Sequence, residues 1–433
     1  MSSESTVASP KLEAAIAGVR RLAPSGYSLD GRAASIALAP ASVDEVGRCL
    51  RAANDAGRGV VPWGGGTQLG LGNLAQSVDV ALDFRGLNAI VEYEPHDMTI
   101  AVQAGHTLGE LDRILAEHGQ VLPVDATDPD RATLGGLVAA GMSGPRRFGY
   151  APLRDLIIGI AAVLPDGREA RAGGMVVKNV SGFDLMRLYH GSLGSLAVIV
   201  QVNLKVLPRY QAERTVLVRF DDLASASMAS EVVRLSQLGV TAVVLLDRGA
   251  AARTELAAAP WTLAVRCEAP PVAVVRQAER VVQACDSGPN AADIVGADET
   301  PALWRRVARM LSAEPTWTEL AVRLGVRPSE MQATGGRVAD LAASASAGAA
   351  TMLDVGSGLV YTRVPGSIDA LRPVWGRLGA IGAHSTLITA PVAVREEIDV
   401  FGAEPAGFPV MRALKDQFDP NRILNRGRFA GHL

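Results

Sequence analysis

The stretch from Val60 to Asn73 constrains this chain more than any other, because five of its fourteen residues are glycine. It reads Val-Val-Pro-Trp-Gly-Gly-Gly-Thr-Gln-Leu-Gly-Leu-Gly-Asn. A short apolar run ends at Pro62, and three consecutive glycines then leave a turn without any Cβ atoms. The backbone N–H groups of such a turn can converge on one point, so the turn can hold an anion.

The glycine spacing leaves two interpretations open. The loop lacks the Gly-Lys-Ser/Thr ending of a nucleotide-triphosphate loop, and it lacks the Gly-x-Gly-x-x-Gly spacing before a helix. One interpretation is a pyrophosphate cradle built from amides and the Thr67 hydroxyl. The other is a glycine-rich hairpin without a ligand. The loop alone does not decide between them.

Helices and strands alternate through the first third of the chain. Apolar spacing predicts helices over 11–22, from Ser42 onward and over 108–118, and strands over 78–84, 89–94 and 98–104. Thr107 and Glu110 have the spacing of a capping box at the start of the third helix. This alternation indicates an α/β or α+β domain that handles a nucleotide.

A second glycine-rich region lies between Val121 and Gly149, where the regular pattern fades apart from a short helix predicted over 134–140. Long irregular stretches in a compact domain usually need a ligand or a partner to order them. The glycines of this region would let the backbone approach a flat ring closely, or would let a small helix pack tightly under a sheet. Both alternatives remain open on the glycines alone.

A third informative block follows a predicted hairpin. The hairpin has strands over 156–164 and 169–172, joined by an Asp-Gly turn. After it, the sequence predicts a helix over 183–189, a tight turn over 191–194 and a long strand over 197–207 that Pro208 stops.

Composition limits the classes of function. The chain of 433 residues has a net charge of −3 and no block of like charge, which argues against nucleic acid as the main partner and gives no electrostatic reason for membrane binding. Neither a secretory signal nor an apolar run long enough for a membrane span is visible, so we expect a cytoplasmic protein. The three cysteines are far apart and are expected to be buried free thiols, at Cys49, Cys267 and Cys285.

The three glycine-containing blocks, in this order, resemble the PCMH-type FAD-binding domain of the vanillyl-alcohol oxidase and D-lactate dehydrogenase superfamily. The motif Pro-x-Gly-Gly-Gly-Thr-x-x-Gly at 62–70 is similar to that family's pyrophosphate loop, and Thr-Leu-Gly-Gly at 133–136 is similar to its second glycine pair. The segment 182–194 resembles the part that closes the site, and 415–427 resembles the tail that returns to the FAD domain. Arg426 stands where the family most often has proline.

Within this superfamily, the run Lys-Asn-Val-Ser-Gly-Phe-Asp-Leu-Met-Arg-Leu at 178–188 resembles the FAD-binding subunits of bacterial glycolate oxidases. This resemblance implies a catalytic flavin subunit and an iron–sulfur subunit as partners, a small hydroxy acid as substrate, and membrane contact only through partners. The sister catalytic subunits carry a C-terminal His-x-Gly-Asp-Gly-x-x-His motif that this chain lacks, so we expect no metal site. Thr67 stands about where flavin-tethering relatives have histidine, which implies non-covalent FAD.

The resemblance also implies the cofactor contacts. They are Pro62, Trp63, Gly64, Gly65, Gly66, Thr67, Gln68, Gly70, Thr133, Leu134, Gly135, Gly136, Gly141, Gly144, Gly182, Asp184, Gly194 and Ile199. Because a reduced flavin carries negative charge toward N1, a nearby cation is expected. Arg146, Arg147 and Lys178 are candidates, although solvated surface charge is an equal alternative for the two arginines. No convincing base is apparent: His190 is expected to pack beside Tyr189, and the catalytic residues stay unassigned.

The middle of the chain predicts a second fold unit. Strand, helix, strand, strand and helix follow one another over 214–285, which suggests a ferredoxin-like cap. Helices over 299–311, 336–345 and 369–378 and a hairpin over 351–363 come next. Trp304, Trp317 and Trp375 are pocket walls, interface anchors or core residues.

The expected fold class is therefore α+β, with a PCMH-type FAD-binding domain of two α/β subdomains and an antiparallel-sheet, ferredoxin-like cap. The expected division is an extension over 1–30, the FAD domain over 31–209, the cap over 210–405 and the returning tail over 406–433. The leading functional hypothesis is an FAD subunit of a glycolate-oxidising complex. The alternatives are a self-sufficient FAD-dependent oxidoreductase of another hydroxy acid or alcohol, and a flavin-free structural subunit.

Overall fold

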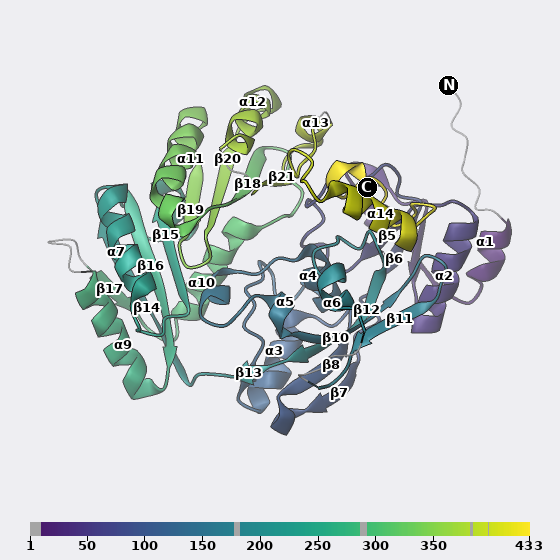
Figure 1. The fold of residues 1–433 in the computed structure, drawn as a ribbon, viewed down its shortest axis with the longest axis horizontal. Coiled ribbons are helices and arrows are strands. Elements are labelled where there is room, and N and C mark those ends of the chain that lie inside the picture. Colours follow the sequence, from purple (N-terminus) through teal and green to yellow (C-terminus); the bar gives the residue numbers. More distant parts are fainter. Residues whose placement is uncertain (1–9, 177–181, 286–291, 382–383, 397) are drawn as a thin grey trace.

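The computed structural model describes residues 10–176, 182–285, 292–381, 384–396 and 398–433 (Figure 1). A four-stranded sheet, a five-stranded sheet and two two-stranded sheets come from the N-terminal part of the chain, and one eight-stranded sheet comes from the part after residue 211. The C-terminal segment packs beside strands β5 and β6 of the N-terminal part. No helix among the described residues is long and apolar enough to cross a membrane.

The first sheet has the order β1-β4-β6-β5 and holds the glycine loop at its edge. Its strands are β1 (Arg20–Leu22), β4 (Ile36–Ala39), β6 (Val80–Asp83) and β5 (Val60–Trp63), and the last three are parallel. Helix α2 (Val43–Asp55) begins where the Ser42 hydroxyl accepts a hydrogen bond from Glu45 N, as expected. The helix predicted over 11–22 is wrong in its second half. Helix α1 (Pro10–Ala15) ends before Gly18, whose φ of 85° directs the chain into β1.

The second sheet is antiparallel, with the order β11-β10-β12-β8-β7. Its strands are β11 (Glu169–Gly173), β10 (Ile157–Val163), β12 (Val198–Lys205), β8 (Thr99–Gln103) and β7 (Ile90–Glu94). Helix α2 lies between the two sheets, because Val46 and Leu50 share a core with Ala161 and Val200. Helices α3 (Leu108–Glu117) and α4 (Leu134–Ala140) pack on the other face.

Two local predictions near these elements have different outcomes. The capping box of α3 is present, with hydrogen bonds running both ways between Thr107 and Glu110. Pro208 does not stop the pairing, however. It lies in the two-residue strand β13 (Leu207–Pro208), which pairs with β9 (Gln120–Val121). A proline is accommodated there because the strand is an edge strand.

The large sheet has eight antiparallel strands and confirms the ferredoxin-like cap. The first βαββαβ unit is β14 (Ala212–Phe220), α7 (Leu223–Leu235), β15 (Ala242–Asp247), β16 (Trp261–Ala269), α9 (Pro271–Ala284) and β17 (Ala292–Val295). A second unit repeats it: β18 (Glu319–Gly325), α11 (Met331–Ala345), β19 (Ala350–Asp354), β20 (Leu359–Pro365), α12 (Ile368–Gly379) and β21 (His384–Thr389). The order β17-β14-β16-β15-β19-β20-β18-β21 joins the two units through their second strands.

The four long cap helices lie on the outer face of this sheet, away from the N-terminal sheets (Figure 1). The inner face carries α8 (Arg248–Arg253) and α10 (Thr300–Ala308), which share a core with residues of both parts of the chain, including Leu71 and Leu193. Trp375 belongs to the outer core, and Trp317 is exposed. Cys49, Cys267 and Cys285 are buried thiols, as expected.

The C-terminal tail returns to the first sheet. Helix α14 (Phe408–Phe418) leads into a segment that runs beside β5, where Val60 N donates to Ile423 O at 2.7 Å and Asn425 N donates to Val60 O at 2.9 Å. The strand that leads into the glycine loop is therefore held by hydrogen bonds to the C-terminal tail. The remaining helices and strands are β2 (Ser28–Leu29), β3 (Arg32–Ala33), α5 (Leu153–Leu156), α6 (Leu185–Tyr189) and α13 (Val392–Arg395).

Candidate functional site

The glycine loop packs against the segment that precedes helix α4. A Cβ atom on Gly64 would lie 2.2 Å from Thr133 Oγ1, and a Cβ atom on Gly65 would lie 1.7 Å from Arg131 O. Arg131 Nη2 also donates to Gly65 O at 3.0 Å. The two backbones approach so closely that only glycine fits at these two positions.

Two adjoining cavities of about 80 Å³ each lie between this loop and helix α4. Predicted residues that line one or both are Pro62, Trp63, Gly64, Gly65, Gly66, Thr67, Gln68, Thr133, Gly135, Gly136, Gly194 and Ile199. The fold thus brings together the three sequence blocks at one place. The cavities share several walls, among them Ala139, Leu193 and Asn425.

The loop has unused hydrogen-bonding capacity on the side of the cavities. Within the described ranges, the backbone N–H groups from Gly64 to Gln68 donate no hydrogen bond to the protein. The buried Gln68 Oε1 also has no hydrogen-bond partner within those ranges. Consecutive free amides in a glycine turn form a concave site for an anion, so these residues fit a diphosphate group.

Arg428 provides a buried positive charge at the same place. Its Nη2 donates to Leu69 O and Leu71 O at 2.6 Å each, and its buried Nε has no hydrogen-bond partner among the residues that the structure describes. Burial lowers the pKa of Arg428 to about 10, so the guanidinium stays protonated at neutral pH. Sequence reasoning missed Arg428 and Asn425 as cavity residues. The signal in the sequence that could have identified them was their position at the end of the returning tail.

The other predicted contacts lie outside the two cavities. Gly70 N donates to Ala313 O, and Leu134 is a core residue. Gly144 packs on Asp125, and Gly141 packs on Gly191. Asp184 caps α6 by accepting from Arg187 N, and Gly182 has open space around its Cα. These positions serve turns, caps and packing within the structure.

The three predicted cations also lie away from the glycine-loop cavities. Arg146 pairs with Asp125, Nε to Oδ1, at 2.9 Å, and lines a different cavity. Arg147 lies close enough to Asp354 to affect its titration. Lys178 lies outside the described residues. His190 is half-buried, and burial lowers its pKa; its Nε2 has no hydrogen-bond partner in the described part of the chain.

A polar cluster lies on the inner face of the cap sheet. Arg323 on β18 pairs in register with Tyr361 on β20, and Arg323 Nη1 lies 3.4 Å from Met142 Sδ. Asp354 at the end of β19 is 1% exposed, and burial raises its pKa to about 7. Met142 and Tyr361 share a hydrophobic core with Leu71 and Leu193, which line the glycine-loop cavities.

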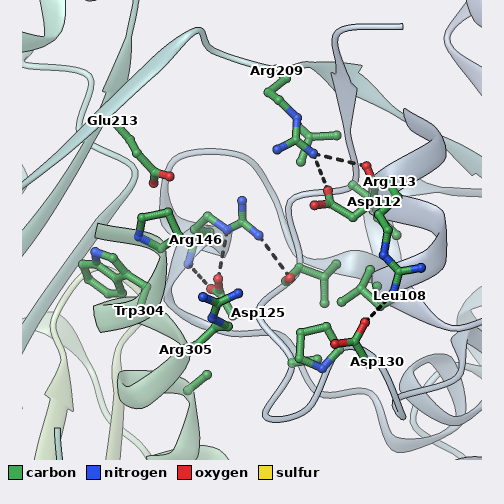
Figure 2. Close-up of a pocket in the computed structure, with 18 of the residues that line it drawn as sticks. Leu108, Asp112, Arg113, Asp125, Asp130, Arg146, Arg209, Glu213, Trp304 and Arg305 are labelled. Atoms are coloured by element: carbon green, nitrogen blue, oxygen red, sulfur yellow. Dashed lines mark hydrogen bonds and ion pairs between the residues drawn. The ribbon is translucent and has the colours of Figure 1, made fainter. Parts of the chain in front are cut away.

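A larger cavity of about 390 Å³ lies between helix α3 and the cap (Figure 2). It shares no lining residue with the two cavities at the glycine loop. Five arginine and four carboxylate side chains line it, and Trp304 forms part of its wall. Among the described residues, no group of three or more His, Cys, Asp and Glu side chains could hold a metal ion.

Comparison with protein families gives two matches. Residues 34–182 match the FAD binding domain, and residues 402–429 match the C-terminal domain of FAD linked oxidases. The first range holds the glycine loop and α4, and the second holds the returning tail with Arg428.

Known proteins resemble the chain over different lengths. The glycolate oxidase subunit GlcD of Bacillus subtilis is 26% identical over 414 residues, which cover 90% of this chain and 88% of that protein. The glycolate oxidase subunit GlcE of Escherichia coli is 40% identical over 132 residues, which cover 30% of this chain and 38% of that protein.

Solved structures share the fold. P-cresol methylhydroxylase with substrate bound has a TM-score of 0.74 at 16% identity, covering 96% of this chain and 95% of the other. An alkyldihydroxyacetonephosphate synthase has a TM-score of 0.65 at 18% identity, covering 91% of this chain and 76% of the other. The chain therefore has an FAD binding domain with the PCMH-type fold and the C-terminal domain of FAD linked oxidases, and it is an FAD-dependent oxidoreductase.

Proposed function

We propose that this chain is the FAD-binding subunit of a complex that oxidises glycolate, a 2-hydroxy acid, to glyoxylate. The observation that carries the proposal is the similarity to two glycolate oxidase subunits, one of which aligns with 90% of the chain. A catalytic flavin subunit and an iron–sulfur subunit are the proposed partners. We place the complex in the cytoplasm, with any membrane contact made by those partners.

The proposed cofactor site is the pair of cavities at the glycine loop. The free amides from Gly64 to Gln68 would hold the pyrophosphate, together with the Thr67 hydroxyl. The backbone beside Thr133 and Gly136 would contact the rest of the cofactor. Arg428, which lines the same cavity as Gly64 to Gln68, would supply a positive charge beside the pyrophosphate. Position 67 is a threonine, where flavin-tethering relatives have histidine, so FAD would be bound non-covalently.

When bound, FAD would supply the acceptor for two electrons from the hydroxy acid. The chain's own contribution is then to hold the cofactor and exclude water from it. Leu71 and Leu193 lie between the glycine loop and the cap sheet and would close the cavity on that side. In the complex, the substrate would be oxidised by the catalytic subunit.

Anaerobic flavin reduction tests whether the catalytic subunit, and not this chain, oxidises glycolate. Glycolate added to the purified, FAD-loaded chain should leave its 450 nm flavin absorbance unchanged within the turnover time of the complex. Adding the catalytic and iron–sulfur subunits should then give glycolate-dependent reduction. Rapid bleaching by the chain alone would contradict the accessory role.

One observation favours a second candidate, a self-sufficient hydroxy-acid oxidoreductase. Asp354, with a pKa near neutral, lies close to Arg147, and Arg147 and Arg323 both lie close enough to Tyr361 to affect its titration. No ion pair involving Arg147, Arg323 or Asp354 is found within the described ranges. A carboxylate that can accept a proton beside unpaired arginines would suit a 2-hydroxy acid. If this candidate holds, a panel of 2-hydroxy acids should include one that reduces the flavin of the isolated chain, and Asp354→Asn should abolish that reduction with FAD retained.

A further inference from the structure

The 390 Å³ cavity lies between two parts of the chain that are distant in sequence (Figure 2). One wall is formed by α3 and the segment from Val121 to Asp130, and the other by β14, β16 and α10 of the cap. Helix α10 presents a single face to it, since Pro301, Trp304, Arg305 and Ala308 have the spacing i, i+3, i+4 and i+7. The cavity is large enough for a ligand with a small ring.

Four of the five arginines in the wall are already neutralised. Arg113 pairs with Asp130, Arg146 with Asp125, Arg209 with Asp112, and Arg266 with Glu213. Arg305 has no ion pair or hydrogen bond with any described part of the chain. Glu268, behind the wall, lies 3.9 Å from Arg146 Nη1 and 3.7 Å from Arg266 Nε, so Arg305 is the lining arginine for which no carboxylate partner is found among the described residues. One unpaired guanidinium at the wall favours a ligand that carries a single negative charge.

Two buried guanidinium groups have donors to spare beside the cavity. Arg146 uses Nε and Nη2 for hydrogen bonds to Asp125 and Val124 O, and its Nη1 lies 3.9 Å from Glu268. Arg266, 6% exposed, uses Nε and Nη2 for Glu213, and its Nη1 lies 3.8 Å from Asp125. Neither Nη1 makes a hydrogen bond with the described residues. Buried donors normally have a hydrogen-bond partner, so an acceptor atom of a ligand would supply the missing partner for both Nη1 groups.

The rest of the wall is apolar. The residues that contribute to it are Leu108, Val121, Leu122, Val124, Ala126, Pro129, Pro301, Trp304 and Ala308. The indole of Trp304 is held in place because its Nε1 donates to Thr215 Oγ1 at 2.9 Å and because the guanidinium of Arg266 lies 5.7 Å above its ring. A fixed aromatic face and aliphatic side chains provide contact for a hydrocarbon group.

The cavity is separate from the cofactor site. Pro129 and Asp130 line it, whereas the next residues, Arg131 and Thr133, contact the glycine loop. The segment 129–133 thus separates the two sites, which have no lining residue in common.

We propose that this cavity binds a small amphipathic monocarboxylate, with its carboxylate at Arg305 and its hydrocarbon group against Trp304. This site does not depend on whether the chain itself oxidises any acid. Its ligand differs from glycolate in having a hydrocarbon group large enough to contact the apolar wall.

Fluorine NMR of the FAD-loaded, full-length chain labelled with 5-fluorotryptophan tests the proposal directly. The Trp304 resonance is assigned from its absence in Trp304→Phe. Mandelate should shift this resonance saturably, whereas benzyl alcohol, which lacks the charge, and glycolate, which lacks the hydrocarbon group, should each bind at least about tenfold more weakly. The flavin absorbance of the same sample reports FAD occupancy, so loss of the cofactor is not mistaken for loss of this site.

Arg305→Ala should weaken mandelate binding by about tenfold, the effect of one charge-assisted hydrogen bond, and Arg305→Lys should weaken it less. Arg309→Ala is the matched control, since Arg309 is exposed just after the same helix and is not part of the cavity wall. It should bind mandelate like the parent chain. The proposal is overturned if mandelate leaves the Trp304 resonance unmoved, if Arg305→Ala binds as tightly as the parent, or if benzyl alcohol or glycolate binds as tightly as mandelate.

Discussion

At Gly65 the structure has no room for a methyl group. Because an added Cβ would lie 1.7 Å from Arg131 O, Gly65→Ala must push the loop away from the segment before α4. Overpacking of this kind costs about 1–3 kcal/mol. We expect FAD affinity to fall by about tenfold or more, measured by the change in flavin fluorescence on titration. Gly86→Ala is the control, since its Cβ would meet open space. Equal affinities for the two variants would contradict the tight fit.

Asp354 should make stability depend on pH. Burial raises the pKa of its carboxyl from 3.8 to about 7 in the folded chain. Between these values the folded state holds a proton that the unfolded state has lost, so this carboxyl makes stability fall as pH rises through the window, by up to about 1.4 kcal/mol per pH unit.

Asp354→Asn removes this titration and keeps an acceptor for Ser357 N, which lies 3.2 Å from Asp354 Oδ1. Relative to the parent, the variant should therefore be more stable at pH 8 than at pH 4, as measured by urea unfolding at both values. If the difference in stability between variant and parent is the same at pH 4 and pH 8, the pKa of Asp354 is not raised in the folded chain.

At the scale of elements, the returning tail depends on one buried lysine. Lys415, 1% exposed, donates from Nζ to Ser195 O, Asp419 Oδ2 and Leu424 O at 2.7, 2.7 and 3.1 Å. Lys415→Met would leave the Asp419 carboxylate buried without its cation, a change that costs about 3–5 kcal/mol.

We expect a clear drop in Tm for Lys415→Met and partial recovery when Asp419→Asn is added, because the second change removes the unpaired charge. Lys205→Met, at a half-buried lysine on β12 without an ion pair in the described part of the chain, should change Tm little. If both lysine variants melt at the same temperature, the tail is not held in this way.

Local patterns predicted some elements far better than others. Helix α4 and the cap of α3 agree with their predictions because the signals, a threonine cap and helical spacing, are local. Strands β18 and β21 were missed, and with them the second ferredoxin-like unit. Strand β18 alternates Leu320, Val322 and Leu324 toward the outer core with Ala321 and Arg323 toward the inner face, but no clear turn signal marks its ends.

At the candidate site, too, residues with a local sequence signal were predicted and residues that depend on long-range contacts were not. The loop at 64–68 and the pair at 135–136 were predicted because glycine runs report backbone approach directly. Arg428 and Asn425 reach the cavities only through the parallel pairing of the tail with β5. That contact joins residues more than 350 positions apart, which no local pattern encodes.

At the scale of the whole molecule, the cap and the N-terminal sheets are joined by charge as well as by apolar contact. Arg266 of the cap lies 3.8 Å from Asp125, which pairs with Arg146 of the N-terminal part. The glycine-loop cavities and the 390 Å³ cavity lie on either side of the segment 129–133. This segment thus contributes residues to the walls of both sites.

The absorbance spectrum of the purified chain, before and after acid precipitation, tests the central claim most directly. The account predicts flavin bands near 370 and 450 nm with about one FAD per chain, and release of that flavin into the supernatant because it is not covalently bound. A colourless chain that takes up no added FAD, or a flavin that stays with the precipitate, would contradict it.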